Sequence, residues 1–198
     1  DVCSSDLHYL DPSGLTGATR IFLDKAFIVL PMVFVIVLGD IDISVASTVA
    51  LSSVVMGVAY NSGVPMELAV IICLMVGTIC GLLNGLLIVK FKELSAVIVT
   101  LSTMTIYRGI AFIILGDLAA GGFPQWFSFL GWGSVAGIPF MLIAFLCFAL
   151  IFALVLHKTT FGRRVFAMGN NIVASRFSGV QVDKIKVLVF TVTGFMAA

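Results

Sequence analysis

Two carboxylates, Asp40 and Asp42, lie close together within the segment Gly39–Ser44, in the most apolar part of the sequence. The stretch 26–89 contains no Lys or Arg, and Glu67 is its only other charged residue. A carboxylate at the centre of a membrane-spanning helix is unfavourable by roughly 3 kcal/mol. Two of them therefore indicate a break in the helix, a water-filled site, or a site for an ion or charged ligand.

The composition explains why these charges stand out. The chain has 198 residues, of which 61% are hydrophobic and 11% are charged, and its mean hydropathy is +1.20. A soluble domain usually has about 25% charged residues. The sequence therefore predicts an all-α, polytopic bundle of transmembrane helices, because unpaired backbone groups in lipid cost several kcal/mol.

The apolar residues form five segments and the beginning of a sixth. These segments are 26–38, which contains Pro31, 45–60, 68–89, 95–115 and 138–156, and a last one that starts near Val187. We interpret residues 1–7 as a leftover of cloning or assembly and 8–25 as a polar N-terminal segment. This leaves 26–198 as the transmembrane domain.

The basic residues predict the orientation. Six of the eleven Lys and Arg lie within 157–186, which is therefore expected to be a cytoplasmic loop. The segment 116–140 has no Lys or Arg, and its Trp126 and Trp132 fit the outer interface. Alternation of the segments puts the acidic break on the cytoplasmic side. A break within the membrane, between two half-helices, is the alternative that the sequence leaves open.

No catalytic or metal-binding pattern is found in the sequence. It has no glycine-rich phosphate loop and no nucleophile elbow, His8 and His157 are isolated, and the cysteines have no metal-ligand spacing. We therefore expect that the chain is not an enzyme and that it binds neither a metal nor a cofactor.

Two further features belong to the apolar segments. Gly77, Gly81 and Gly85 are spaced by four residues, which predicts a face where another helix packs closely. Asn84, beside them, is expected to form a hydrogen bond to another helix. Arg108 lies far along a hydroxyl-rich segment and must snorkel outward, face a water-filled cavity or pair with a carboxylate.

The basic loop carries more than charge. Spaced glycines and apolar residues such as Val165 and Phe177 indicate a folded element that docks onto a partner protein. The residues that we assign to this coupling loop are Thr160, Gly162, Arg163, Gly169, Asn171, Ser178 and Gly179.

Four stretches in this order resemble the sugar-type permeases of ABC importers. Gly39–Ser47 is similar to their "GGIDLSVGS" signature, and Gly81–Gly85 matches "G-x-x-N-G". Thr100–Gly109 matches "TLGTM…RG", and Thr160–Val180 matches their cytoplasmic "T-x-x-GR…SGI" loop. The resemblance extends over 26–198 and is to permeases for ribose, rhamnose and autoinducer-2; Ser62–Met66 and His157–Thr159 favour the autoinducer-2 type.

This resemblance implies a permease subunit in the bacterial inner membrane, of which the chain would hold about half of the roughly ten spans. Two such subunits, identical or related, would enclose a pathway for a monosaccharide or sugar-like signal. An extracytoplasmic binding protein would deliver the substrate, and two cytoplasmic ATPases, which bind the ATP, would dock onto the loop 160–180.

The chain departs from the family pattern at two positions of the signature. Asp40 stands where a second glycine is usual, and Ala46 stands where glycine is common. Asp42 keeps its place and is expected either to cap the following helix or to contact substrate, with Ser44 beside it. The alternative function is an ion-coupled transporter or channel that uses the acidic pair.

Overall fold

The structure, a computed structural model, describes residues 12–116, 121–135 and 137–198. Residues 1–7, which we interpreted as a leftover of cloning or assembly, lie outside these ranges. The helices are α1 (Pro12–Val37), α2 (Val45–Asn61), α3 (Met66–Lys90), α4 (Ala96–Leu115), α5 (Gln125–Trp132), α6 (Phe140–Lys158), α7 (Thr160–Asn170), α8 (Ile172–Phe177) and α9 (Val182–Ala197). A short antiparallel pair, β1 (Ser134–Val135) and β2 (Ile138–Pro139), precedes α6. The predicted class, a bundle of transmembrane helices, is confirmed.

Three of the described helices are long and apolar enough to cross a membrane, namely α3, α4 and α6. Their ends lie within two residues of the predicted segments. The apolar parts Lys25–Val37 and Val45–Asn61 are shorter, at 13 and 17 residues. They flank the acidic break, so the chain before and after it forms two short apolar helices rather than one long span.

The structure differs from the sequence-based expectation at three places. The helix α1 begins within the segment 8–25 that we interpreted as polar, and α9 begins at Val182 rather than near Val187. The external segment 116–140 contains α5 and the β-pair, neither of which was predicted. Short elements of this kind escape hydrophobic periodicity because they hold too few residues to show a repeat.

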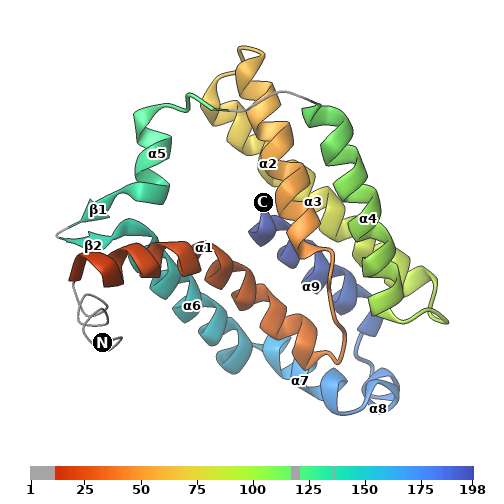
Figure 1. Cartoon of the computed structure of the whole chain (residues 1–198). Coiled ribbons are helices and arrows are strands. Elements are labelled where there is room, and N and C mark those ends of the chain that lie inside the picture. The colour runs from red at the N-terminus through yellow and green to blue at the C-terminus, as the bar shows by residue number, and fades with distance from the viewer. Residues whose placement is uncertain (1–11, 117–120, 136) are drawn as a thin grey trace, which may run out of the picture.

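Figure 1 shows how the helices are arranged. The helices α2, α3, α4 and α9 lie together, and α1 and α6 run side by side on the other side of α9. The helices α7 and α8 lie at the end of the bundle where α1 ends. The predicted coupling loop is therefore a folded pair of helices at one end of the transmembrane part.

The three regularly spaced glycines of α3 face α9 across a close helix–helix contact. A Cβ atom placed on Gly81 would collide with the carbonyl oxygen of Phe190, and one on Gly85 would lie 2.8 Å from the Cα of Val187. Gly194 of α9 fills the opposite side, since a Cβ there would meet the backbone of Gly77 and Gly81. The two backbones approach closely because Gly77, Gly81 and Gly85 of α3 and Gly194 of α9 have no side chain between them.

This seam generates a stability prediction. Replacing Gly81 by Ala adds a methyl group where the α9 backbone lies, and overpacking of this kind costs about 1–3 kcal/mol. We expect the variant to unfold at a lower temperature in detergent. Gly109→Ala on α4 is the matched control, because a Cβ there meets nothing within 4 Å. Equal melting temperatures of the two variants would contradict the close contact.

Candidate functional site

The helix α1 ends in a tight glycine turn directly before the acidic segment. Gly39 has a φ of 80°, a left-handed conformation that non-glycine residues rarely adopt. Its N–H donates to the carbonyl of Ile36 at 2.9 Å, and the N–H of Asp40 donates to that of Val35 at 3.1 Å. This pair of bonds is a Schellman motif, which satisfies the last carbonyls of a helix. The chain then runs without helical structure until α2 begins at Val45 (Figure 1).

Asp42 fixes the residue that precedes α2. Its Oδ1 accepts hydrogen bonds from the backbone N–H of Ser44 at 2.9 Å and from the Ser44 hydroxyl at 2.7 Å. The Ser44 carbonyl accepts the N–H groups of Ser47 and Thr48, both at 2.9 Å, which starts the helix. The sequence placed Asp42 at the free N–H groups of the following helix. The structure places it on Ser44, one residue ahead of the helix, and adds the side-chain bond.

Asn84 joins this turn to α3. Its Nδ2 donates to the Ser44 hydroxyl at 2.7 Å. The hydroxyl of Tyr107 on α4 shares its hydrogen between the Cys80 carbonyl, at 3.0 Å, and Asn84 Oδ1, at 3.1 Å. Asn84 and Ser44 are both almost completely buried. Asn84 therefore bonds to another helix, as expected, through Tyr107 of α4, and it also bonds to Ser44 at the helix break.

Thr100 on α4 holds the backbone of the extended segment. The N–H of Ile43 donates to Thr100 Oγ1 at 3.3 Å, and the Thr100 hydroxyl lies 3.4 Å from the Ile41 carbonyl. Non-helical backbone is tolerated at membrane depth only where protein groups or water satisfy it. The sequence did not single out Thr100, because a hydroxyl can equally bond back within its own helix.

The position of Asn84 gives the depth of the break within the bundle. Asn84 lies six residues before Lys90, the last residue of α3, which corresponds to about 9 Å along the helix axis. The Ser44 turn is therefore inside the helical bundle. It lies near the same end of α3 as Lys90.

Asp40, the other member of the acidic pair, has a partner on α9. Lys186 Nζ lies 2.6 Å from Asp40 Oδ2, and the two side chains are only 15% and 14% exposed. Asp42 is occupied by Ser44, so each carboxylate already has an intramolecular partner. The sequence did not connect Asp40 with Lys186, because 146 residues separate them.

Arg108 does not join this network. It lies on α4 as an exposed side chain, and no ion pair joins it to a carboxylate among the residues that the structure describes. Of the predicted break residues, the structure brings together Gly39, Asp40, Asp42, Ser44 and Asn84. It adds Thr100, Tyr107 and Lys186, which sequence reasoning had left out of this site.

The buried face of α2 carries hydroxyl groups. Ser44, Ser47, Thr48 and Ser52 follow a helical spacing and are all buried. Thr48 and Ser52 donate to carbonyls one turn earlier, at 3.3 and 2.8 Å. Within the described part of the chain, the Ser47 hydroxyl is the one buried side-chain group that has no hydrogen-bond partner. A buried polar group without a partner is unfavourable by about 1–3 kcal/mol.

Two glycines of the predicted coupling loop lie at close contacts. Gly162 lies inside α7, where a Cβ would collide with the Leu156 carbonyl of α6. A Cβ on Gly169 would collide with the Val37 carbonyl at the end of α1. These glycines therefore allow α7 to pack onto α1 and α6.

The other loop residues shape α7 and α8. Asn171 Oδ1 accepts the N–H of Ala174 at 2.9 Å and so caps α8. Gly179, with a φ of 81°, follows the end of α8. Ser178 donates to the Ala174 carbonyl at 3.0 Å. Thr160 and Arg163 are exposed on α7. An unpredicted residue, Thr159, caps α7 by accepting the N–H of Gly162 at 3.2 Å.

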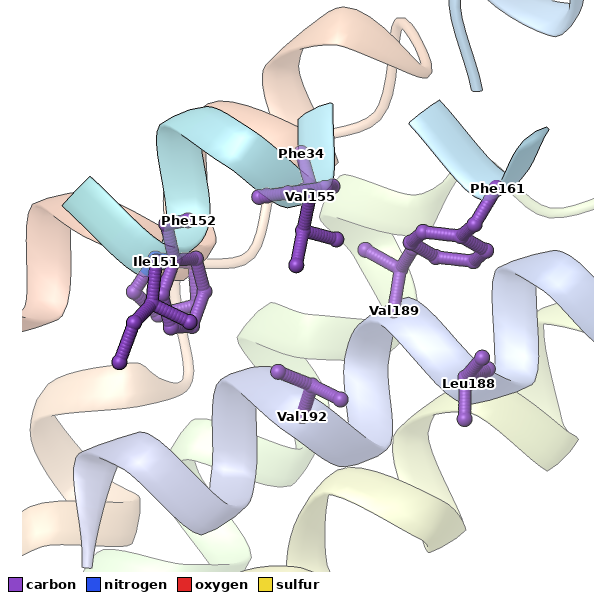
Figure 2. Close-up of a pocket in the computed structure, with 9 residues that line it drawn as sticks. Phe34, Ile151, Phe152, Val155, Phe161, Leu188, Val189 and Val192 are labelled. Carbon is purple, nitrogen blue, oxygen red and sulfur yellow. The ribbon is translucent and has the colours of Figure 1, made fainter. Parts of the chain in front are cut away.

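A separate cavity lies between α1, α6, α7 and α9. Its volume is about 290 Å³, and Figure 2 shows side chains such as Phe152, Val155 and Phe161 around it. All its lining residues are Pro, Phe, Ile, Leu or Val. A sugar needs hydrogen-bond partners for its hydroxyl groups, so this cavity has no features of a sugar site.

Comparison with known proteins now places the chain. The profile of the family described as the permease component of branched-chain amino acid transport systems matches residues 15–198. The chain belongs to this permease family. It is a multi-pass protein of the inner membrane, and membership of a permease family agrees with the expectation that it is not an enzyme.

The individual proteins that the chain resembles are named more specifically than the family. The chain is 36% identical over 200 residues to the autoinducer 2 import system permease protein LsrD of Yersinia enterocolitica, covering 98% of the chain and 60% of that relative. Proteins of the same name from Escherichia coli K12 and Shigella flexneri are 36% identical over 195 residues, with 96% of the chain and 59% of each relative covered. These matches confirm the resemblance to the sugar-type permeases of ABC importers.

The matches cover only part of each relative. The chain spans about three fifths of the length of the curated relatives that it matches. No solved structure matches the chain significantly.

The role of Asp42 can be tested by two substitutions. Asn keeps a side-chain oxygen that can accept both hydrogen bonds from Ser44, whereas Leu has no oxygen and can accept neither hydrogen bond. If Asp42 acts by holding Ser44, Asp42→Asn should keep near-normal transport and Asp42→Leu should lose it, as measured by substrate uptake in cells. Lost uptake in Asp42→Asn, with normal amounts of protein in the membrane, would instead support direct contact with substrate.

Two serines, Ser44 directly before α2 and Ser47 in its first turn, provide a second test. Ser44→Ala removes the group that links Asp42 and Asn84, and we expect a loss of about 1–3 kcal/mol because buried partners are left unpaired. Ser47→Ala removes a hydroxyl that has no partner, so its stability should be unchanged or increased. Thermal unfolding of the two purified variants measures both effects. A larger loss in Ser47→Ala would contradict the network.

Proposed function

We propose that the chain forms the membrane-spanning part of a permease subunit of an ABC importer. Its cargo is autoinducer-2 or a related monosaccharide-like compound. The observation that carries this proposal is the 36% identity over nearly the whole chain to relatives named as autoinducer 2 import permeases. The family description names branched-chain amino acids instead, so the substrate assignment rests on these relatives.

The partners follow from this role. A second permease, identical or related, would complete the pathway, and an extracytoplasmic binding protein would deliver the substrate. Cytoplasmic ATPases would bind and hydrolyse ATP, so the permease itself needs no cofactor. The buried ends of broken helices form substrate sites in several transporter folds, which makes the Ser44 turn a candidate part of the pathway.

The surface of α7 and α8 supports docking of an ATPase. One face of α7 is buried, through Val165 and Met168. On α8, the side chains of Val173 and Phe177 are 63% and 89% exposed, and Arg163 on α7 is also exposed. An exposed aromatic side chain on a rigid helix is typical of the anchor residues of protein interfaces.

The ion-coupled alternative rested on the acidic pair as a relay. Asp40 forms an ion pair with Lys186, and Asp42 accepts a hydrogen bond from Ser44. Each carboxylate therefore already has a partner within the protein and is not free to bind an ion. No observation on the described residues now favours this alternative over the importer.

The substrate can be tested with a chimera. Residues 26–198 replace the matching part of LsrD in E. coli cells that lack the native protein, and removal of autoinducer-2 from the medium is measured. We expect uptake that requires an active ATPase. Ribose uptake under the same conditions is the comparison. A chimera that reaches the membrane and imports ribose but not autoinducer-2 would overturn the proposed substrate. Uptake that is independent of the ATPase would overturn the assignment to the ABC importers.

The docking surface can be tested by Phe177→Asp. A charge at the centre of an interface should reduce co-purification of the ATPase roughly tenfold or more. Phe177 is 89% exposed, so folding of the permease should not change. Phe91→Asp is the control, since Phe91 is 47% exposed and lies after α3, outside α7 and α8. Equal co-purification of both variants would contradict docking at Phe177.

A further inference from the structure

Five charged side chains from four parts of the chain line one cavity at the end of the bundle where α8 lies. The cavity has a volume of about 420 Å³. Asp40 comes from the break, Lys92 from the turn after α3 and Arg176 from α8, while Asp183 and Lys186 come from the first turns of α9. Segments far apart in the sequence therefore meet through charges around α9.

These charges form two groups on α9. Lys186 pairs with Asp40 at 2.6 Å, and the two side chains are 15% and 14% exposed. Asp183 pairs with Lys92 at 2.9 Å and with Arg176 at 3.1 Å, and these side chains are 44–54% exposed. Asp183 and Lys186 are three residues apart and so lie on one side of α9.

The two groups differ in strength because they differ in exposure. Water and salt screen exposed ion pairs, which contribute about 0–1 kcal/mol each. A pair that is largely buried is screened much less, and removing one partner leaves an uncompensated charge in a largely buried position. The contact of α9 with the break is therefore firm, and the contacts of Asp183 with α8 and the turn after α3 are weak.

We propose that Lys186 is a positioning residue that fixes the extended break, through Asp40, to α9. Asp183 links α8 to the same end of α9 by contacts that are easily exchanged. Only residues 178–181 separate α8 from α9. A displacement of α8 by a docked partner therefore moves the first turns of α9 through this short connection while the exposed contacts of Asp183 exchange, and the break moves with α9. The first part of this proposal stands on the geometry alone, and the second part rests on the proposed function.

A distance measurement on the complete permease tests the first part. Spin labels are placed at Ile41→Cys in the break and Leu188→Cys on α9, after replacement of the native cysteines. These side chains are 51% and 49% exposed, so they accept a label. We expect a narrow distribution of distances in the parent protein and a broader one in Asp40→Ala and in Lys186→Met.

The double variant makes this test specific. Asp40→Ala combined with Lys186→Met removes the same single contact as either substitution alone, so its distribution of distances should be about as broad as in a single variant and not the sum of the two. Lys184→Gln is the matched control, because Lys184 is an exposed cation on the same helix. Distributions that remain narrow in both single variants, that broaden equally in Lys184→Gln, or that broaden additively in the double variant would overturn the role of Lys186.

Transport tests the second part. In the assembled importer, each single variant should lower the substrate taken up per ATP hydrolysed roughly tenfold, in the range of coupling between linked sites, while assembly remains normal. Uptake and ATP hydrolysis that fall in proportion would show a merely structural role and overturn the coupling. If the parent importer neither hydrolyses ATP nor takes up substrate, the proposed function fails, and the spin-label distances still decide on Lys186.

Discussion

The extended segment between α1 and α2 needs hydrogen-bond partners, and this need constrains the rest of the bundle. Its Asp42 and Ser44 are buried, and backbone N–H and C=O groups that are removed from water without partners are strongly unfavourable. The Thr100 hydroxyl oxygen accepts a hydrogen bond from the N–H of Ile43, and the side-chain amide of Asn84 donates one to the hydroxyl of Ser44. These partners come from α4 and α3, so three helices must keep one register for the break to exist.

The helix α9 contacts both α3 and the extended segment. It lies against α3 along a seam where Gly81 and Gly194 let the backbones approach closely. Because this contact is so close, it also fixes where the first turns of α9 lie. Lys186 thereby comes within hydrogen-bond distance of Asp40. A packing feature of the transmembrane part thus places a charged contact at the break.

The helices α7 and α8 combine a fixed position with an exposed face. Gly162 and Gly169 place α7 directly against the backbone of α6 and α1, and capping residues fix where the two short helices begin and end. Phe177 remains almost fully exposed beyond this buried face. A rigidly held element with an exposed aromatic residue suits contact with another protein better than a mobile basic loop would.

The sequence by itself determined the class of protein, the main apolar helices and the residues around the break, because hydrophobic runs and unusual charges are local properties of a chain. It also indicated a glycine face on α3 and a folded cytoplasmic loop. It could not pair Asp40 with Lys186, choose Thr100 among the many hydroxyls of α4, or separate Arg108 from the break. These features depend on which helix faces which, and only the tertiary structure decided them, because side chains distant in the sequence interact only after the helices have packed.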